Sequence, residues 1–244
     1  MTINPLCEKY YAVSPYAYCL NNPINAIDPD GRKIIFVNGY LGFGSPSGGA
    51  TYWGGANSAF VQGAKTFFND ANTPVFTDIG HGKLSTSSWR RSKGYDYAKE
   101  NYASLIDGMK EGETFKLVSH SMGGAFSDGV MKYLKEQGWD VDVAVYFNAW
   151  SPTSIEGSDG TILVDATVTN DWVQALSHDK GNINIPNANY TVRKKSNGNW
   201  DTVHRDLIDS GDVWKTDGSV DWNRAMSILQ DWLQQNPNIK VTYQ

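Results

Sequence analysis

Residues 115–124 read FKLVSHSMGG, and this stretch decides the fold that we expect for the chain. A short apolar strand leads into Ser119, and a helix of small and apolar residues follows Gly123. Ser121 lies at the tip of the turn between them. Ser119 and Gly123, two residues before and two after the tip, are small enough for a turn this tight. The pattern predicts a Ser121 hydroxyl pushed out at a sheet edge, beside a helix N-terminus that favours negative charge.

Beyond Gly31 the chain alternates predicted strands with predicted helices. This alternation is typical of a mostly parallel sheet with helices on both faces. The run 33–38 is continuously apolar, as a strand buried on both faces requires. We expect strands at 33–38, 74–78, 114–118, 141–147, 162–168 and 190–194, and helices at 58–69, 95–110, 124–136 and 222–235. The sequence therefore predicts one α/β domain behind a short irregular N-terminal arm.

The composition of the 244 residues excludes several classes of protein. The net charge of -5 offers no basic surface for nucleic acid. No apolar run approaches the length of a membrane span, and residues 1–5 have neither the basic start nor the apolar core of a signal peptide. Hydrophobic residues make up 40% of the chain, which is enough for the core of one large α/β domain.

Neither a disulfide framework nor a metal site is predicted. Both cysteines, Cys7 and Cys19, lie close to the N-terminus, so no disulfide can staple the rest of the chain. The 4 histidines are scattered and form neither H-E-x-x-H nor a set with paired cysteines. The glycine-rich stretch 41–55 lacks the G-K-[S/T] of a phosphate loop. We therefore expect no metal and no cofactor.

The turn around Ser121 closely resembles the G-H-S-M-G-G nucleophile elbow of lipases and esterases in the α/β-hydrolase superfamily. Ser119, in the place of the first glycine, is the departure from that pattern. The resemblance implies the α/β-hydrolase fold and a serine nucleophile, followed along the chain by an acid and then a histidine base. The competing interpretation of these residues is a tight strand–helix turn without chemistry.

The resemblance also implies where the acid and the base lie relative to the predicted strands. The resemblance places the acid after a late strand, where Asp171 follows 162–168, and the base after the last strand, where His204 follows 190–194. Asp165 lies inside a predicted strand, and His178 precedes the last one. We therefore favour Asp171 over Asp165 and His204 over His178.

Two further histidines need a role. His120 precedes the nucleophile, and we expect its side chain to pack under the turn. His81, in Gly80-His81-Gly82, either lines a pocket or belongs to a loop turn.

An oxyanion hole needs two backbone N–H groups aimed at one oxygen. We expect the first from Met122, directly after the nucleophile. The second is expected from the loop 38–42, which resembles the H-G-x-x-G loop of lipases with Asn38 in the place of histidine. Its predicted donor is Tyr40, with Leu41 as the alternative. A plain glycine turn is the other interpretation of this loop.

The substrate clues are aromatic and apolar. Gly39, Leu41 and Phe43 are expected to contact the substrate, and the loop 41–59 with its aromatic residues is predicted to be a lid or an acyl-binding wall. Three tryptophans fall near the predicted carboxyl edge of the sheet, where ligands of α/β proteins bind: Trp150, Trp172 and Trp200. The competing interpretation, which we weigh equally, is that these tryptophans belong to the hydrophobic core.

Residues 10–31 read YYAVSPYAYCLNNPINAIDPDG, which is rich in turn residues. This stretch resembles the end of the core domain of RHS-repeat (YD-repeat) proteins, with Ser14 in the place of the first asparagine of that pattern. There it marks the junction with a variable C-terminal toxin. An ordinary tyrosine-rich arm is the competing interpretation. The resemblance predicts an RHS remnant at 1–32 and a hydrolase domain at 33–244.

Together these patterns predict a serine esterase of lipase or phospholipase type. The RHS resemblance implies an antibacterial effector that is cytoplasmic in its producer and delivered into target cells. It also implies a cognate immunity protein and an RHS core with secretion apparatus in a longer parent. Peripheral contact with a membrane is expected for an enzyme that acts on lipid or acyl-ester substrates. The alternatives are a thioesterase, amidase or peptidase on the same triad, or a non-catalytic binding module that retains the fold.

Overall fold

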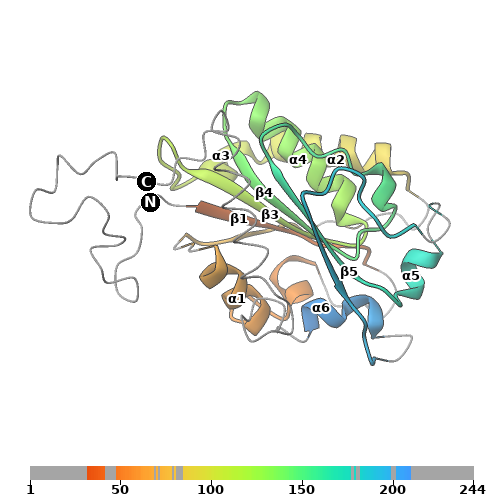
Figure 1. Cartoon of the computed structure of the whole chain (residues 1–244). Coiled ribbons are helices and arrows are strands. Elements are labelled where there is room, and N and C mark those ends of the chain that lie inside the picture. Colours follow the sequence, from red (N-terminus) through yellow and green to blue (C-terminus); the bar gives the residue numbers. More distant parts are fainter. Residues whose placement is uncertain are drawn as a thin grey trace, which may run out of the picture.

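The computed structural model (Figure 1) describes most of the chain between residues 32 and 209. The described residues are 32–41, 48–68, 70, 72–78, 80, 85–176, 179, 182–198 and 202–209. The expected N-terminal arm and the helix expected at 222–235 lie outside them.

Six parallel strands among the described residues form the centre of the domain. They are β1 (Arg32–Val37), β2 (Val75–Phe76), β3 (Thr114–His120), β4 (Val141–Phe147), β5 (Ile162–Val168) and β6 (Tyr190–Lys194). Their order in the sheet is β2-β1-β3-β4-β5-β6, and all neighbours are parallel. The strands lie where the sequence predicts them, and the parallel sheet is confirmed.

Helices cover both faces of this sheet (Figure 1). On one side lie α1 (Ala59–Phe67) and α6 (Asp206–Asp209), and on the other α2 (Ser87–Glu100), α3 (Tyr102–Ile106) and α4 (Gly123–Glu136). The short α5 (Trp172–Ala175) follows β5. Three 3-10 helices complete the described elements: η3 (Gly49–Trp53), η4 (Pro152–Ser154) and η5 (Val203–Arg205).

Alternation along β1 explains why both faces are buried. Ile34 and Phe36 belong to a core cluster shared with α1 and α6, whereas Ile35 and Val37 belong to a cluster shared with α4. All four side chains are fully buried. Because successive side chains of a strand point to opposite faces, a continuous apolar run must be covered on both sides.

The helix expected at 95–110 differs from the structure. Helix α2 begins at Ser87, where the Thr86 hydroxyl accepts the Trp89 N–H at 3.2 Å, and it ends at Glu100. Its packing against α4 depends on glycines. A Cβ on Gly94 would lie 1.9 Å from the Phe126 carbonyl oxygen, so the two backbones touch where side chains would normally interdigitate. Because backbone contacts at glycine replace apolar side chains here, the first half of α2 shows no apolar periodicity. The sequence-based prediction therefore missed residues 87–94 of the helix.

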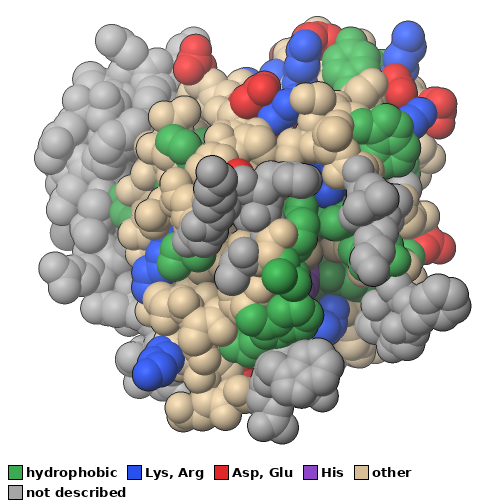
Figure 2. Space-filling model, turned by 90° about the vertical axis from the view of Figure 1, so that its right-hand side faces the viewer, with side chains coloured by type: hydrophobic (Ala, Val, Ile, Leu, Met, Phe, Trp, Pro, Cys, Tyr) green, Lys and Arg blue, Asp and Glu red, His purple; other side chains and the backbone are tan. Residues whose placement is uncertain are grey.

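The strand register brings the segments that follow β1, β3 and β4 to one edge. Val37 pairs with Ser119, and His120 pairs with Phe147. The Ser121 N–H continues the ladder by donating to the Phe147 carbonyl at 2.9 Å. This carboxyl edge lies on the right in Figure 1 and faces the viewer in Figure 2. The chain therefore turns at Ser121 in the place where ligands of α/β sheets bind.

Candidate active site

Ser121 occupies a strained turn between β3 and α4. Its φ of 54° lies in the left-handed region, which residues with a Cβ rarely adopt. A Cβ on Gly123 would lie 2.5 and 2.6 Å from the backbone oxygens of Asn38 and Val37, so only glycine fits there. Such backbone strain costs about 1–3 kcal/mol and gathers at functional sites. The serine at position 119 is also accommodated, because its hydroxyl donates to a β4 carbonyl at 3.2 Å.

Asp171 and His204 are joined directly. The Asp171 carboxylate caps α5, where its Oδ1 accepts the Val173 N–H at 2.9 Å, and its Oδ2 lies 2.6 Å from His204 Nδ1. The Asp171 side chain is fully buried, whereas that of His204 is 15% exposed. With the Nδ1 proton donated to the carboxylate, the neutral imidazole keeps a lone pair on Nε2. The pair thus has the chemistry of an oriented general base.

The His204 ring lies against the elbow. Its centroid is 4.7 Å from that of His120, the residue before Ser121. His120 is buried, as the sequence predicted, and its Nε2 donates to the His204 carbonyl at 2.9 Å. The structure therefore brings the predicted base to the same turn as the predicted nucleophile. His178 and His81 lie outside the described residues.

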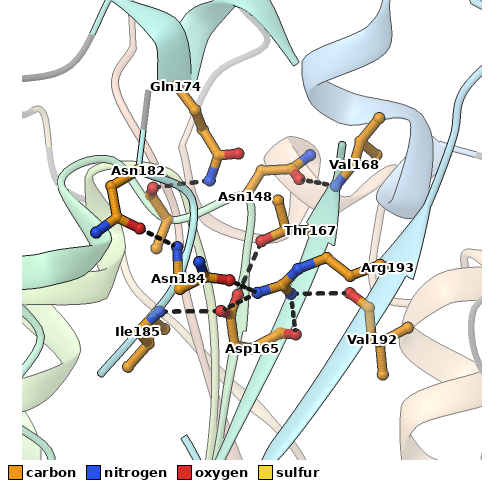
Figure 3. Close-up of polar contacts among 11 residues, drawn as sticks. Asn148, Asp165, Thr167, Val168, Gln174, Asn182, Asn184, Ile185, Val192 and Arg193 are labelled. Atoms are coloured by element: carbon orange, nitrogen blue, oxygen red, sulfur yellow. Dashed lines mark hydrogen bonds and ion pairs between the residues drawn. The ribbon is translucent and has the colours of Figure 1, made fainter. Parts of the chain in front are cut away.

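Asp165 has a structural role (Figure 3). It is fully buried on β5, where its Oδ1 accepts the Thr167 hydroxyl at 2.8 Å. Its Oδ2 accepts the Ile185 N–H at 3.0 Å and pairs with Arg193 Nη2 at 2.7 Å. These partners occupy both carboxylate oxygens inside the sheet. Asp165 is thus bound to Arg193, and Asp171 is the acid that meets His204.

Asn148 was missed by sequence reasoning. It follows β4, has a φ of 44° and is fully buried. Its side-chain amide donates to the His204 carbonyl at 2.7 Å, and its Oδ1 accepts the Val168 N–H at 2.7 Å (Figure 3). Asn148 therefore links the ends of β4 and β5 to the segment that carries His204. The available signal was an asparagine directly after a buried strand, because asparagine tolerates positive φ.

The loop after β1 passes close to Ser121, as the predicted oxyanion loop should. A Cβ on Gly39 would lie 2.9 Å from the Ser121 Cβ, so the backbone passes directly beside it. The Asn38 amide donates to the Gly39 carbonyl at 2.9 Å, and its Oδ1 accepts the Thr77 hydroxyl at 2.8 Å. Within the described residues the N–H groups of Tyr40 and Met122 have no hydrogen-bond partner. These are the two donors that the sequence predicted.

The aromatic stretch after this loop is core, where a lid or acyl-binding wall was expected. Tyr52 and Trp53 are 3% and 1% exposed, and Trp53 stacks on Phe60 of α1 with ring centroids 5.3 Å apart. For Tyr52 and Trp53 the prediction was wrong, because the 3-10 helix η3 folds both rings into the core cluster shared with α1. Leu41 is half-buried against the same core, and Phe43 lies outside the described residues.

The tryptophans of the carboxyl edge differ in their environment. The Trp150 N–H donates to the Ser121 carbonyl at 3.0 Å, which helps to hold the elbow. Trp172 and Leu176, beside Asp171, are 39% and 65% exposed. Figure 2 shows a small histidine surface among hydrophobic side chains on this face. Trp200 lies outside the described residues.

Comparison with known proteins gives similar solved structures at low identity. No protein-family model and no curated protein matches the sequence. A protein from Xanthomonas campestris pv. campestris, assigned to the alpha/beta superfamily of hydrolases, is 11% identical with a TM-score of 0.44, over 75% of this chain and 95% of that one.

Two further solved structures are similar. One from Agrobacterium tumefaciens, of unknown function and assigned as an alpha/beta hydrolase, is 13% identical with a TM-score of 0.46, over 87% of this chain and 88% of that one. A lipase-esterase related protein from Clostridium acetobutylicum ATCC 824 is 21% identical with a TM-score of 0.29, over 49% of this chain and 42% of that one.

The chain has the α/β-hydrolase fold. Its parallel sheet carries helices on both faces, and β3 turns into α4 at a strained serine. Across the described residues, no helix combines the length and apolar character that crossing a membrane requires.

Proposed function

We propose that this protein is a serine hydrolase that cleaves acyl esters, with Ser121 as nucleophile, His204 as base and Asp171 as the orienting acid. The contact that carries the proposal is the 2.6 Å approach of Asp171 Oδ2 to His204 Nδ1, beside a turn that holds Ser121 at positive φ. Serine is a poor nucleophile at neutral pH, and an oriented imidazole beside the serine is what activates it.

The first half of the reaction forms an acyl-enzyme. Ser121 Oγ attacks the ester carbonyl carbon while His204 Nε2 takes the hydroxyl proton. The carbonyl oxygen becomes an oxyanion, which the N–H groups of Met122 and Tyr40 stabilise. When the tetrahedral intermediate collapses, the bond to the alkoxy group breaks and His204 returns its proton to the leaving alcohol. Asp171 stabilises the imidazolium while it exists.

The second half returns the enzyme to its starting state. A water molecule gives one proton to His204 Nε2 and attacks the acyl carbonyl carbon. The second tetrahedral intermediate collapses by breaking its bond to Ser121 Oγ, and the imidazolium protonates that oxygen. The products are a carboxylic acid and free enzyme. Each donor of an oxyanion hole contributes about 10²–10³-fold to such a reaction.

Lipid esters are the substrate class that the surface around the site favours. Trp172 and Leu176, at the two ends of the short helix that Asp171 caps, expose large apolar side chains at 39% and 65% of their surfaces. Apolar groups of this kind match acyl chains or the surface of a bilayer, which is also how the protein would contact a membrane peripherally. We therefore place lipases and phospholipases ahead of thioesterases, amidases and peptidases.

A substrate panel tests this choice of chemistry. Wild type and Ser121→Ala are assayed in parallel on p-nitrophenyl esters of increasing chain length, triacylglycerols, phospholipid vesicles, acyl thioesters and peptide amides. The proposal expects hydrolysis of esters with lipids among the best substrates, and no hydrolysis by Ser121→Ala. Cleavage of amides or thioesters with esters untouched would reassign the reaction, and inertness towards every member would favour a binding module.

The RHS-like residues 10–31 support a biological setting for this chemistry. We propose that the hydrolase domain at 33–244 acts as a toxin delivered into competing bacteria, and that an immunity protein blocks it. Expression of wild type inside bacteria should arrest growth, whereas Ser121→Ala should not. Equal growth with both proteins would contradict the toxin role. It would leave the proposed ester hydrolysis unaffected, because the substrate panel tests that activity separately.

A further inference from the structure

Tyr52 and His120 form a buried polar pair between the oxyanion loop and the base. Tyr52, on η3, is 3% exposed, and its hydroxyl lies 2.5 Å from His120 Nδ1. A Cβ on Gly39 would lie 2.6 Å from the same hydroxyl oxygen, so the oxyanion loop passes directly over it. The other ring nitrogen of His120 reaches the His204 carbonyl at 2.9 Å. One unbroken chain of contacts thus runs from Gly39 to the base.

The direction of these hydrogen bonds is fixed by chemistry. A carbonyl can only accept, so His120 Nε2 carries the proton that it shares with His204. Burial lowers the pKa of His120 well below its usual value, so the imidazole is neutral and its Nδ1 is an acceptor. Burial also raises the pKa of Tyr52 to about 12, so the phenol keeps its proton and donates it to Nδ1.

The segment that carries the base is held from a second side as well. Arg205, the neighbour of His204, lies over the Tyr52 ring with its guanidinium carbon 4.6 Å from the centroid. Its Nη2 donates to the Tyr52 carbonyl at 2.7 Å. Asn148 supplies the second donor to the His204 carbonyl at 2.7 Å. Tyr52 therefore contacts the base segment both through His120 and through Arg205.

We propose that Tyr52 and His120 are positioning residues, which set the place of the His204 imidazole relative to the nucleophile and the oxyanion loop. Asp171 fixes the rotation of the ring, whereas the chain from Tyr52 fixes the backbone that carries it. A displacement of about 1 Å in such a group can cost 10²-fold in rate. An apolar pair of the same size would fill the space but would leave the His204 carbonyl with one donor fewer. The inference rests on the proposed function.

A matched pair of tyrosine variants tests the proposal. Tyr52→Phe removes one buried hydroxyl from the chain. Tyr146→Phe removes another buried hydroxyl, which donates to Asp128 of α4 at 2.8 Å and forms no hydrogen bond with the described residues of the His204 segment. Both variants lose a buried hydrogen bond, so both should melt at a lower temperature.

Activity separates the two variants. Measured per titrated active site, well below either melting temperature, kcat of Tyr52→Phe should fall about tenfold with KM within about twofold of wild type. The kcat of Tyr146→Phe should stay within about twofold. Equal kcat values for the two variants would overturn the proposal.

Variants of His120 provide the rescue. His120→Leu removes both bonds and should lower kcat by about 10²-fold. His120→Gln keeps an amide that can donate to the His204 carbonyl, and it should recover at least about tenfold of that loss. A His120→Gln enzyme as slow as His120→Leu would contradict a positioning role.

A readout that needs no substrate separates failure of this inference from failure of the proposed function. Imidazole 15N spectra of wild type should show His120 as the neutral Nε2–H tautomer. The His204 resonances should move in Tyr52→Phe and stay in place in Tyr146→Phe. Unmoved His204 resonances in Tyr52→Phe would overturn the positioning role. Full esterase activity of Ser121→Ala would instead contradict the proposed triad. The spectra would then still show whether Tyr52 sets the position of the His204 ring.

Discussion

Asp171 Oδ2 and His204 Nδ1 lie 2.6 Å apart, although 33 residues of chain separate them. Neither residue belongs to a strand. Asp171 caps the helix after β5, and His204 lies on the 3-10 helix after β6. Two adjacent parallel strands therefore deliver an acid and a base to the same edge of the sheet, and the hydrogen bond between them orients the imidazole.

The two candidate acids should respond differently to the same change. Asp171→Asn should lower kcat by up to ~10⁴, because asparagine cannot stabilise the imidazolium and favours the wrong tautomer of His204. Its melting temperature should change little. Asp165→Asn should instead lower the free energy of unfolding, because Arg193 loses its buried charged partner. We expect a loss of about 2–3 kcal/mol, since the Arg193 side chain is partly exposed and water still solvates its charge. Chemical denaturation and kcat measured on both variants check this, and a folded but inactive Asp165→Asn would contradict it.

Adding one methyl group beside the nucleophile should impair catalysis. A Cβ on Gly39 would lie 2.6 Å from the Tyr52 hydroxyl and 2.9 Å from the Ser121 Cβ. Gly39→Ala must therefore displace the oxyanion loop, and kcat should fall by about 10²-fold. Gly80→Ala is the control, because a Cβ at that position meets no atom within 4 Å. Equal kcat values for the two alanine variants would show that the loop after β1 plays no part in catalysis.

Helix packing gives a prediction whose sign is unusual. Replacing glycine by alanine inside a helix normally stabilises it by about 1 kcal/mol. Gly94→Ala should do the opposite, because its Cβ would lie 1.9 Å from the Phe126 carbonyl oxygen and push α2 away from α4. We expect a loss of about 1–3 kcal/mol in the free energy of unfolding. Ser92→Ala, on the exposed side of α2, serves as the control, and a stabilised Gly94→Ala would contradict the packing described.

Stability should fall in mild acid because of His120. Burial, followed by smaller contributions from His204 and Arg205, lowers the pKa of His120 well below 6.5 in the folded protein. The unfolded chain therefore binds a proton at this residue from about pH 6.5 downwards while the folded protein does not. Stability is lost as pH falls through that value, and the loss continues down to the folded-state pKa.

His120→Gln isolates this effect from that of buried carboxyls. Burial raises the pKa values of Asp70 and Asp128, which acts in the opposite direction at lower pH in both proteins. Between pH 6 and pH 5 wild type should lose up to about 1.4 kcal/mol per pH unit more than His120→Gln. Parallel stability curves from urea denaturation would show that His120 titrates normally.

Much of this architecture could be predicted because it is encoded locally. The strands are short apolar runs, and the elbow at Ser121 is a contiguous pattern of residue sizes. Asp171 and His204 could be proposed because the resemblance to α/β-hydrolases places the acid after a late strand and the base after the last one. The roles of Asn148 and Tyr52 could not be predicted, because they depend on hydrogen bonds to residues that are distant in the sequence. The first half of α2 was not predicted for a related reason. Gly94 packs backbone against backbone, so no apolar pattern marks this part of the helix.

Covalent labelling tests the assignment of Ser121 as the nucleophile. Wild type and Ser121→Ala are treated with an alkyl fluorophosphonate, the modified peptide is mapped by mass spectrometry, and ester hydrolysis is followed in the same samples. We expect one phosphonyl group on Ser121 with parallel loss of activity. Ser121→Ala should remain unmodified, with hydrolysis about 10³–10⁶-fold below wild type. Modification of a different residue, or activity of Ser121→Ala within about tenfold of wild type, would contradict this assignment.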